Sequence, residues 1–94
     1  EKFVEKACHN PAKIFNIKDR GFLKENYFAD MVLIDLKQPT KVTKNNIMYK
    51  CGWSPFEDYT FNSSILKTWV NGELIYNEGQ IVNQRPGKSL EYER

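Results

Sequence analysis

The feature that most constrains this chain is the stretch 65–82, which reads as three short strands joined by two tight turns. Its first run is rich in β-branched and aromatic residues, which favour strands. Asn71-Gly72 then supplies two residues that tolerate positive φ, as a two-residue type I′ hairpin turn requires. A second turn follows at Asn77-Glu78-Gly79. We therefore predict an antiparallel meander, with Trp69 in the core.

The size and charge of the chain exclude several classes of protein. Ninety-four residues make one domain at most, with a small core. The net charge is only +2, and the basic residues are dispersed among acids, unlike those of a nucleic-acid-binding protein. No apolar stretch approaches the ~20 residues that cross a bilayer, and no signal peptide is evident. We expect a cytoplasmic protein with neither a nucleic acid nor a membrane as partner.

The chain begins inside an amphipathic pattern. Four residues, spaced to share one helical face, form what we call the helix stripe: Phe3, Val4, Ala7 and Cys8. No capping residue precedes them. We expect residues 1–9 to be the end of a helix in a piece cut from a longer protein, and the stripe to dock on the missing part.

Further along, local signals predict short elements. Asn10-Pro11 is typical of an N-cap followed by proline at the first helical position, which predicts a second helix to Phe15. Asn16 would end it in the left-handed conformation. Residues 22–24 are a candidate strand. The apolar run within 30–36 predicts a strand covered on both faces.

In the second half of the chain, the element boundaries are predicted mostly from proline and glycine residues. Pro39 confines residues 38–43 to an edge strand, and residues 45–50 are either a helical turn or extended. Residues 51–59 form an aromatic-rich loop with Gly and Pro, and the polar tail is broken at Arg85-Pro86-Gly87. The fold class is mixed α/β, mainly β: short helices followed by about five or six strands, which could add to strands from elsewhere.

Cysteine and histidine offer little chemistry. Cys8 and Cys51 could form a disulfide, but two free thiols are favoured because stapled mini-domains carry more cysteines. With His9 they are only three potential zinc ligands, and helical neighbours point about 100° apart. The same geometry disfavours a Cys-His nucleophilic pair. We expect His9 to be a surface or helix-end residue.

The acidic and aromatic residues do not make a catalytic site either. Asp30 and Asp35 would lie ~16 Å apart on opposite strand faces, so they cannot converge on one substrate. We expect them to bond backbone groups in the adjoining turns. Glu57-Asp58 lies among three aromatic residues of the loop: Trp53, Phe56 and Tyr59.

That loop has two interpretations. It could contact a ligand, or its aromatics could fill a gap between subdomains, which we favour. Base stacking on Trp53, Tyr59 and Trp69 is disfavoured by the dispersed charge. We therefore predict no catalytic, substrate-binding or metal-binding residue in this chain.

Two sets of segments nevertheless resemble a known family. Residues 10–15 (Asn-Pro-Ala-Lys-Ile-Phe), 20–23 (Arg-Gly-Phe-Leu) and 29–35 (Ala-Asp-Met-Val-Leu-Ile-Asp) resemble the C-terminal signature of the amidohydrolase superfamily. Residues 49–57, which contain Ser-Pro-Phe-Glu, and the hairpin 68–76 are similar to the cyclic-amide hydrolases, most closely to the dihydroorotase family. The resemblance covers roughly residues 5 to 94. Asn16, Asn26 and Asp58 stand where the family usually has glycine.

The resemblance implies a parent enzyme with a (β/α)8 barrel. Residues 1–18 would be the last helices, packing on the absent barrel. Residues 19–94 would be part of the companion β-sandwich, including the aromatic loop 51–59 and the tail. The family's zinc ligands, a His-x-His pair among them, lie on barrel strands and match no position here.

The resemblance also implies an activity for the parent, whereas this segment would be structural and inactive alone. The parent would interconvert N-carbamoyl-L-aspartate and dihydroorotate in pyrimidine biosynthesis, with zinc as cofactor. Its partners would be the rest of its own chain, its small-molecule substrate and further copies in a homo-oligomer. The alternatives are another cyclic-amide hydrolase (dihydropyrimidinase, hydantoinase or allantoinase) or an autonomous small β-module that binds a protein.

Overall fold

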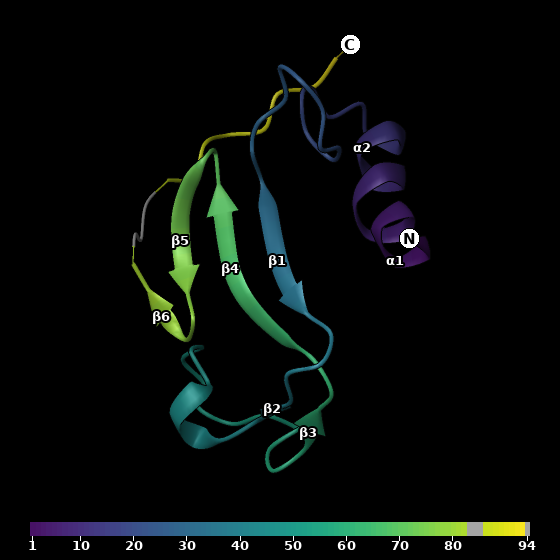
Figure 1. Ribbon diagram of the computed structural model, residues 1–94. Coiled ribbons are helices and arrows are strands. Elements are labelled where there is room, and N and C mark those ends of the chain that lie inside the picture. Colours follow the sequence, from purple (N-terminus) through teal and green to yellow (C-terminus); the bar gives the residue numbers. More distant parts are fainter. Residues whose placement is uncertain (83–85, 94) are drawn as a thin grey trace.

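The computed structural model describes residues 1–82 and 86–93. A short helical segment is followed by a four-stranded sheet and a small two-stranded lobe (Figure 1). The elements, in chain order, are α1 (Lys2–Val4), η1 (Glu5–His9), α2 (Asn10–Ile14), β1 (Met31–Asp35), β2 (Thr40–Lys41), η2 (Lys44–Asn46), β3 (Thr60–Phe61), β4 (Ser64–Val70), β5 (Glu73–Asn77) and β6 (Gln80–Ile81). The fold is mainly β with an N-terminal helix, as predicted.

The predicted meander is confirmed. The main sheet is antiparallel in the order β1-β4-β5-β6, and β2 pairs with β3 separately. Asn71 and Gly72 have φ values of 52° and 80°, and Val70 pairs with Glu73, which is the geometry of a type I′ turn. Glu78 also has positive φ, at 45°. Local turn chemistry thus sets the register of the sheet.

The apolar strand β1 forms, but it is not covered on both faces as predicted. It lies at an edge of the sheet, and among residues 1–82 and 86–93 it pairs with β4 alone. Val32, Leu33 and Ile34 remain 53%, 46% and 47% exposed. The prediction was wrong because a continuous apolar run indicates burial on both faces only where other layers of the fold are present.

The N-terminal segment is one continuous helical stretch, so the predicted break at Asn10 is wrong. Asn10 has helical dihedrals (φ −65°, ψ −45°), and its N–H donates to the carbonyl of Glu5 through a wide π-helical turn. Pro11 has no N–H, and its ring would clash with the carbonyl four residues earlier in a regular helix. The wide turn before it accommodates both defects. Asn16, at φ 53°, ends the helical segment as predicted.

Two other predictions are resolved. Residues 22–24 are not a strand but part of a loop that packs against the helix. Of the open alternative at residues 45–50, a short helical turn, η2, forms as far as Asn46, and Ile47 after it is extended (φ −80°, ψ 116°). Thr43 and Asn46 cap that turn reciprocally, and the Thr43 N–H donates to Asn46 Oδ1 at 3.0 Å.

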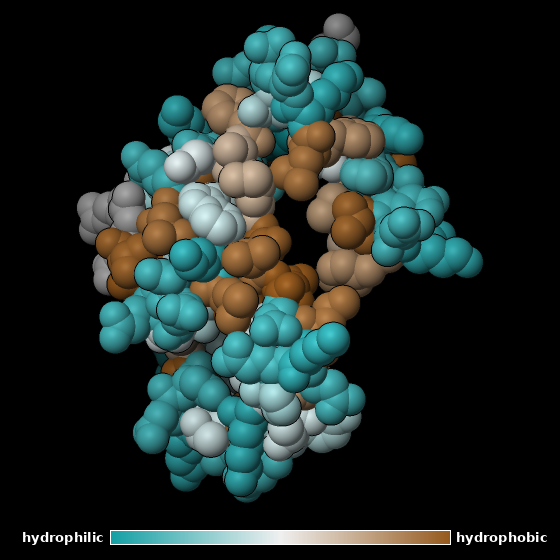
Figure 2. Space-filling view, viewed as in Figure 1, coloured by the Kyte–Doolittle hydropathy of each residue, from teal (hydrophilic) through white to brown (hydrophobic). Residues whose placement is uncertain are grey.

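The described residues bury little apolar surface. Ala12, at 6% exposure, is the one buried hydrophobic residue among them. Trp69 is only partly buried, so its predicted place in a core is wrong. Figure 2 shows apolar side chains on both sides of a hollow between the helical segment and the sheet. No helix in this part of the chain is long and apolar enough to cross a membrane.

Candidate functional site

The site most clearly built by the fold is where helix, loop and hairpin meet. We call this region the junction: residues 12–30 together with the Asn71-Gly72 turn. It contains segment 20–23 and overlaps segments 10–15 and 29–35, the three that resemble the amidohydrolase signature. The packing of these segments shows what their residues do, beginning with a glycine.

Gly21 lets the loop approach the helix closely. A Cβ atom placed on Gly21 would lie 2.4 Å from the Cβ of Ala12 and 2.9 Å from the carbonyl oxygen of Cys8. Gly21 also has φ +89°, which L residues rarely adopt. Both features require glycine, and the contact explains why Ala12 is buried. Beside it, the rings of His9 and Phe22 stack with centroids 4.2 Å apart.

Arg20 and Asp30 connect the loop to the sheet. Arg20 Nη1 donates to Asp30 Oδ2, and the guanidinium lies 4.0 Å from the centroid of the Phe28 ring. Asp30 Oδ1 accepts the N–H of Asn71 at 2.9 Å, which holds the hairpin turn. The Arg20 side chain is 10% exposed and that of Asp30 is 38% exposed. This carboxylate therefore serves a structural network.

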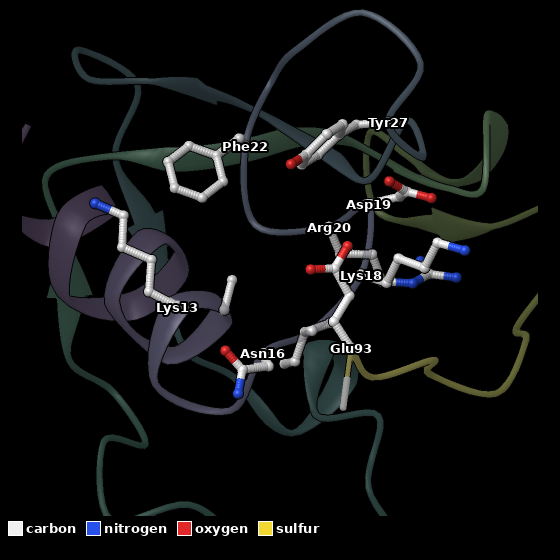
Figure 3. Close-up of a pocket in the computed structure, with 10 residues that line it drawn as sticks. Lys13, Asn16, Lys18, Asp19, Arg20, Phe22, Tyr27 and Glu93 are labelled. Carbon is white, nitrogen blue, oxygen red and sulfur yellow. The ribbon is translucent and has the colours of Figure 1, made fainter.

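A polar cavity of about 180 Å³ lies within the junction. Its lining residues are Ala12, Lys13, Asn16, Ile17, Lys18, Asp19, Arg20, Phe22, Tyr27 and Glu93. Figure 3 shows the Phe22 and Tyr27 rings on one side and Asn16 and Glu93 opposite, with the Lys13 ammonium pointing away. Arg20 pairs with Asp30, and Lys18 lies 3.9 Å from Glu91. Two of its three cations are thus already paired.

The cysteine and histidine candidates do not come together. Cys8 and Cys51 are both free and exposed, as the favoured interpretation predicted. His9 lies mid-helix and not at a helix end as expected, and it is half-buried, with its ring stacked on Phe22. Within residues 1–82 and 86–93, no three His, Cys, Asp or Glu side chains are grouped so that they could hold a metal ion. The residues present therefore do not fit a zinc site.

The two strand aspartates act as expected. Asp35 accepts the N–H of Lys37 at 2.9 Å, so it caps the turn after β1. Asp30 holds the Asn71 turn at the opposite end of the same strand. Each carboxylate bonds a different turn, so they do not form an acid–base pair.

The aromatic loop forms a small cluster in the lobe. Phe56, Tyr59 and Phe61 pack edge-on, with ring centroids 4.8–6.2 Å apart. Asp58 takes φ 66° and donates its N–H to the carbonyl of Val42, so an aspartate fills a left-handed position usual for glycine. Trp53 is 61% exposed. The rings pack on one another and remain open to solvent.

Between the lobe and the sheet lies a larger groove, of about 870 Å³. Its apolar and aromatic lining includes Ile34, Val42, Ile47, Met48, Tyr49, Phe61, Leu66 and Tyr76. The groove and the exposed face of β1 share Ile34. Chemically, the described residues offer apolar surface and structural ion pairs, with no nucleophile beside a base.

The junction contains residues that sequence reasoning did not single out. In the sequence, Arg20 and Gly21 stand out only as members of the family-like segment 20–23. A glycine tolerates positive φ, but the contact of Gly21 with Ala12 depends on tertiary packing. The pairing of Arg20 with Asp30, ten residues away, had no local signal.

Comparison with known proteins places these features in a family. Residues 1–75 match the family model described as Amidohydrolase family. Dihydroorotase from Pyrococcus furiosus is 31% identical over 90 residues, which cover 96% of this chain and 22% of that protein. Dihydroorotase from Endomicrobium trichonymphae is 40% identical over 75 residues, covering 80% and 18%.

Relatives with other names match as well. Allantoinase from Desulfitobacterium hafniense is 34% identical over 89 residues, covering 95% of this chain and 20% of that protein. The solved L-hydantoinase (dihydropyrimidinase) from Arthrobacter aurescens superposes with a TM-score of 0.78 at 26% identity, covering 90% of this chain and 19% of that one. This chain thus spans about a fifth of the length of these relatives. By its sequence and its fold, the chain belongs to the amidohydrolase family.

Proposed function

We propose that this chain is the C-terminal segment of a dihydroorotase, an enzyme that interconverts N-carbamoyl-L-aspartate and dihydroorotate in pyrimidine biosynthesis. Two of the dihydroorotase matches, from Pyrococcus furiosus and Endomicrobium trichonymphae, support the substrate. The segment's own role is structural. It contributes the last helical stretch and part of the β-sandwich that accompanies the barrel, and it carries no catalytic residue.

The observation that carries this role is the exposed apolar surface. In the helix stripe Phe3 is 76% and Val4 45% exposed, and β1 exposes its apolar run as well. A stable monomer rarely leaves contiguous apolar patches open. We propose that the barrel covers the stripe, and that strands from earlier in the parent chain complete the sandwich over the sheet.

The metal of the parent enzyme would be bound outside this chain. We propose zinc there, held by residues outside this chain, because the described residues do not form a zinc site. Zinc would supply Lewis-acid activation of water and carbonyl. The residues of this chain would act indirectly, by fixing the sandwich against the barrel. We also propose a cytoplasmic homo-oligomer.

A second candidate substrate has specific support. The allantoinase and hydantoinase matches are similar in identity and coverage to the dihydroorotase matches. Since these proteins are named for other cyclic amides, the parent could hydrolyse allantoin or a hydantoin with the same scaffold. This candidate changes the substrate but leaves the structural role of the segment as proposed.

The structural role is tested by separating the segment from the rest. The remainder of the parent protein would be expressed alone, with this chain in trans, and with a chain carrying Phe3→Asp and Val4→Asp. We expect soluble, active protein with the wild-type chain and a large loss with the other two. A matched control, Lys2→Asp, changes an exposed charge beside the stripe and should behave as wild type. Full activity of the remainder alone would contradict the proposal.

A further inference from the structure

The described part of the tail, residues 86–93, lies along the exit of the helical segment. The N–H of Lys18 donates to the carbonyl of Glu91 at 2.8 Å, and the N–H of Glu93 donates to the carbonyl of Asn16 at 2.9 Å. These two bonds form an isolated antiparallel bridge. The tail therefore adds a short strand-like partner at the point where the helix ends.

The beginning of the same tail is attached to the sheet. Asn71 Nδ2, in the hairpin turn, donates to the carbonyl of Pro86. The Lys88 ammonium lies 5.7 Å from the centroid of the Phe28 ring. The tail thus runs from the end of the hairpin to the end of the helix, and Figure 1 shows it crossing above β4 and β1.

The helical segment stands beside the sheet (Figure 1). Its contacts with the following loop are the Gly21 approach and the His9–Phe22 stack. Both contacts involve residues 21 and 22 of that loop. The chain leaves the helix at Asn16, which is in the left-handed conformation. The two backbone bonds from the tail therefore add a connection between helix and sheet that does not pass through this loop.

We propose that residues 86–93 are a strap that fixes the angle between the helical segment and the sheet. The strap would present the helix stripe and the open face of β1 as one preformed surface. Preorganisation of this kind lowers the entropic cost of docking. The strap itself stands on the described contacts alone, while its use in docking rests on the proposed function.

The backbone hydrogen bonds, and not the side-chain charges, should fix the angle between the helical segment and the sheet. The Lys18 and Glu91 side chains are 47% and 75% exposed, and they lie 3.9 Å apart, so their ion pair contributes little. Proline at positions 18 and 93 removes both donating N–H groups, because proline has none. Alanine at the same positions keeps both N–H groups and removes only the side chains. The two double variants therefore separate the bonds from the charges.

The angle can be measured between spin labels by double electron–electron resonance. One label goes on the native Cys8 of the helical segment, and the other on Ile65→Cys in β4, with Cys51→Ser to remove the second native thiol. We expect a narrow distance distribution in the otherwise wild-type chain and in Lys18→Ala/Glu93→Ala. In Lys18→Pro/Glu93→Pro the distribution should become at least twice as wide.

Each outcome decides the proposal. A wide distribution in the wild-type chain, or an equally narrow one in the proline variant, would overturn the strap. If circular dichroism shows that the double proline variant has lost its sheet, Glu93→Pro against Glu93→Ala gives the same comparison with one bond removed. The distance measurement needs no substrate or barrel. A failed strap therefore leaves the proposed function standing, and a failed reconstitution leaves the strap standing.

Discussion

Replacing Gly21 by alanine should destabilise the fold more than the same replacement at a turn glycine whose added Cβ would meet no atom within 4 Å. At Gly21 the new methyl group would meet the Cβ of Ala12 at 2.4 Å and the Cys8 carbonyl oxygen at 2.9 Å. The positive φ of 89° adds conformational strain. Left-handed backbone costs an alanine about 1–2 kcal/mol, and overpacking costs roughly 1–3 kcal/mol. Gly21→Ala should therefore lower the free energy of unfolding by about 2–5 kcal/mol.

Gly79 provides the matched control. Its φ is similar, at 95°, but nothing lies within 4 Å of where its Cβ would be. Gly79→Ala should cost only the backbone strain, about 1–2 kcal/mol. The double variant Ala12→Gly/Gly21→Ala removes the closest contact and should recover part of the steric loss.

The assay is urea unfolding of each variant, followed by tryptophan fluorescence and circular dichroism. We predict that Gly21→Ala loses more stability than Gly79→Ala, and that the Ala12→Gly background reduces the cost of Gly21→Ala. Equal losses for the two glycines would refute the close approach of the loop to the helix. Simple additivity in the double variant would show that Ala12 is not the clashing partner.

Three further outcomes are expected. Arg20→Ala should cost about 1–2 kcal/mol in urea unfolding, since it removes the ion pair with the partly exposed Asp30 and the contact of the guanidinium with the Phe28 ring, and Arg20→Lys should cost less; no loss in Arg20→Ala would contradict the network. Trp69→Ala should cost about 1–3 kcal/mol, below the roughly 3–5 kcal/mol typical of a fully buried large aromatic, because Trp69 is only partly buried; a loss in that higher range would mean a tighter environment. Elemental analysis of the dialysed chain should find well under one zinc per molecule, and one tightly held zinc would disprove the absence of a zinc site here.

The elements that sequence predicted well are those fixed by local chemistry. The Asn71-Gly72 turn was predictable because only a few residue types tolerate positive φ at both turn positions, and strand-forming residues lie on both sides of these two. Asn16 ended the helix for the same reason. Asp35 was correctly placed as a strand-end residue that bonds the next turn.

The predictions that failed depended on what packs against an element. Asn10-Pro11 is a typical start signal, yet a π-helical turn absorbs the proline and the helix continues. The burial of β1 and of Trp69 was inferred from residue type alone, which assumes that other layers cover the sheet. Arg20 and Gly21 carry the junction through contacts with residues distant in sequence, which a single sequence does not reveal.

The central claim is that this chain is an inactive structural part of a dihydroorotase. The most direct measurement is hydrolysis of dihydroorotate by equal molar amounts of the isolated chain and of the full-length parent, with allantoin and a hydantoin as parallel substrates. We predict no turnover by the chain, and metal-dependent turnover of dihydroorotate by the parent. Turnover by the purified chain would contradict the structural role. A parent that is inactive on dihydroorotate but fast on allantoin or the hydantoin would contradict the proposed substrate.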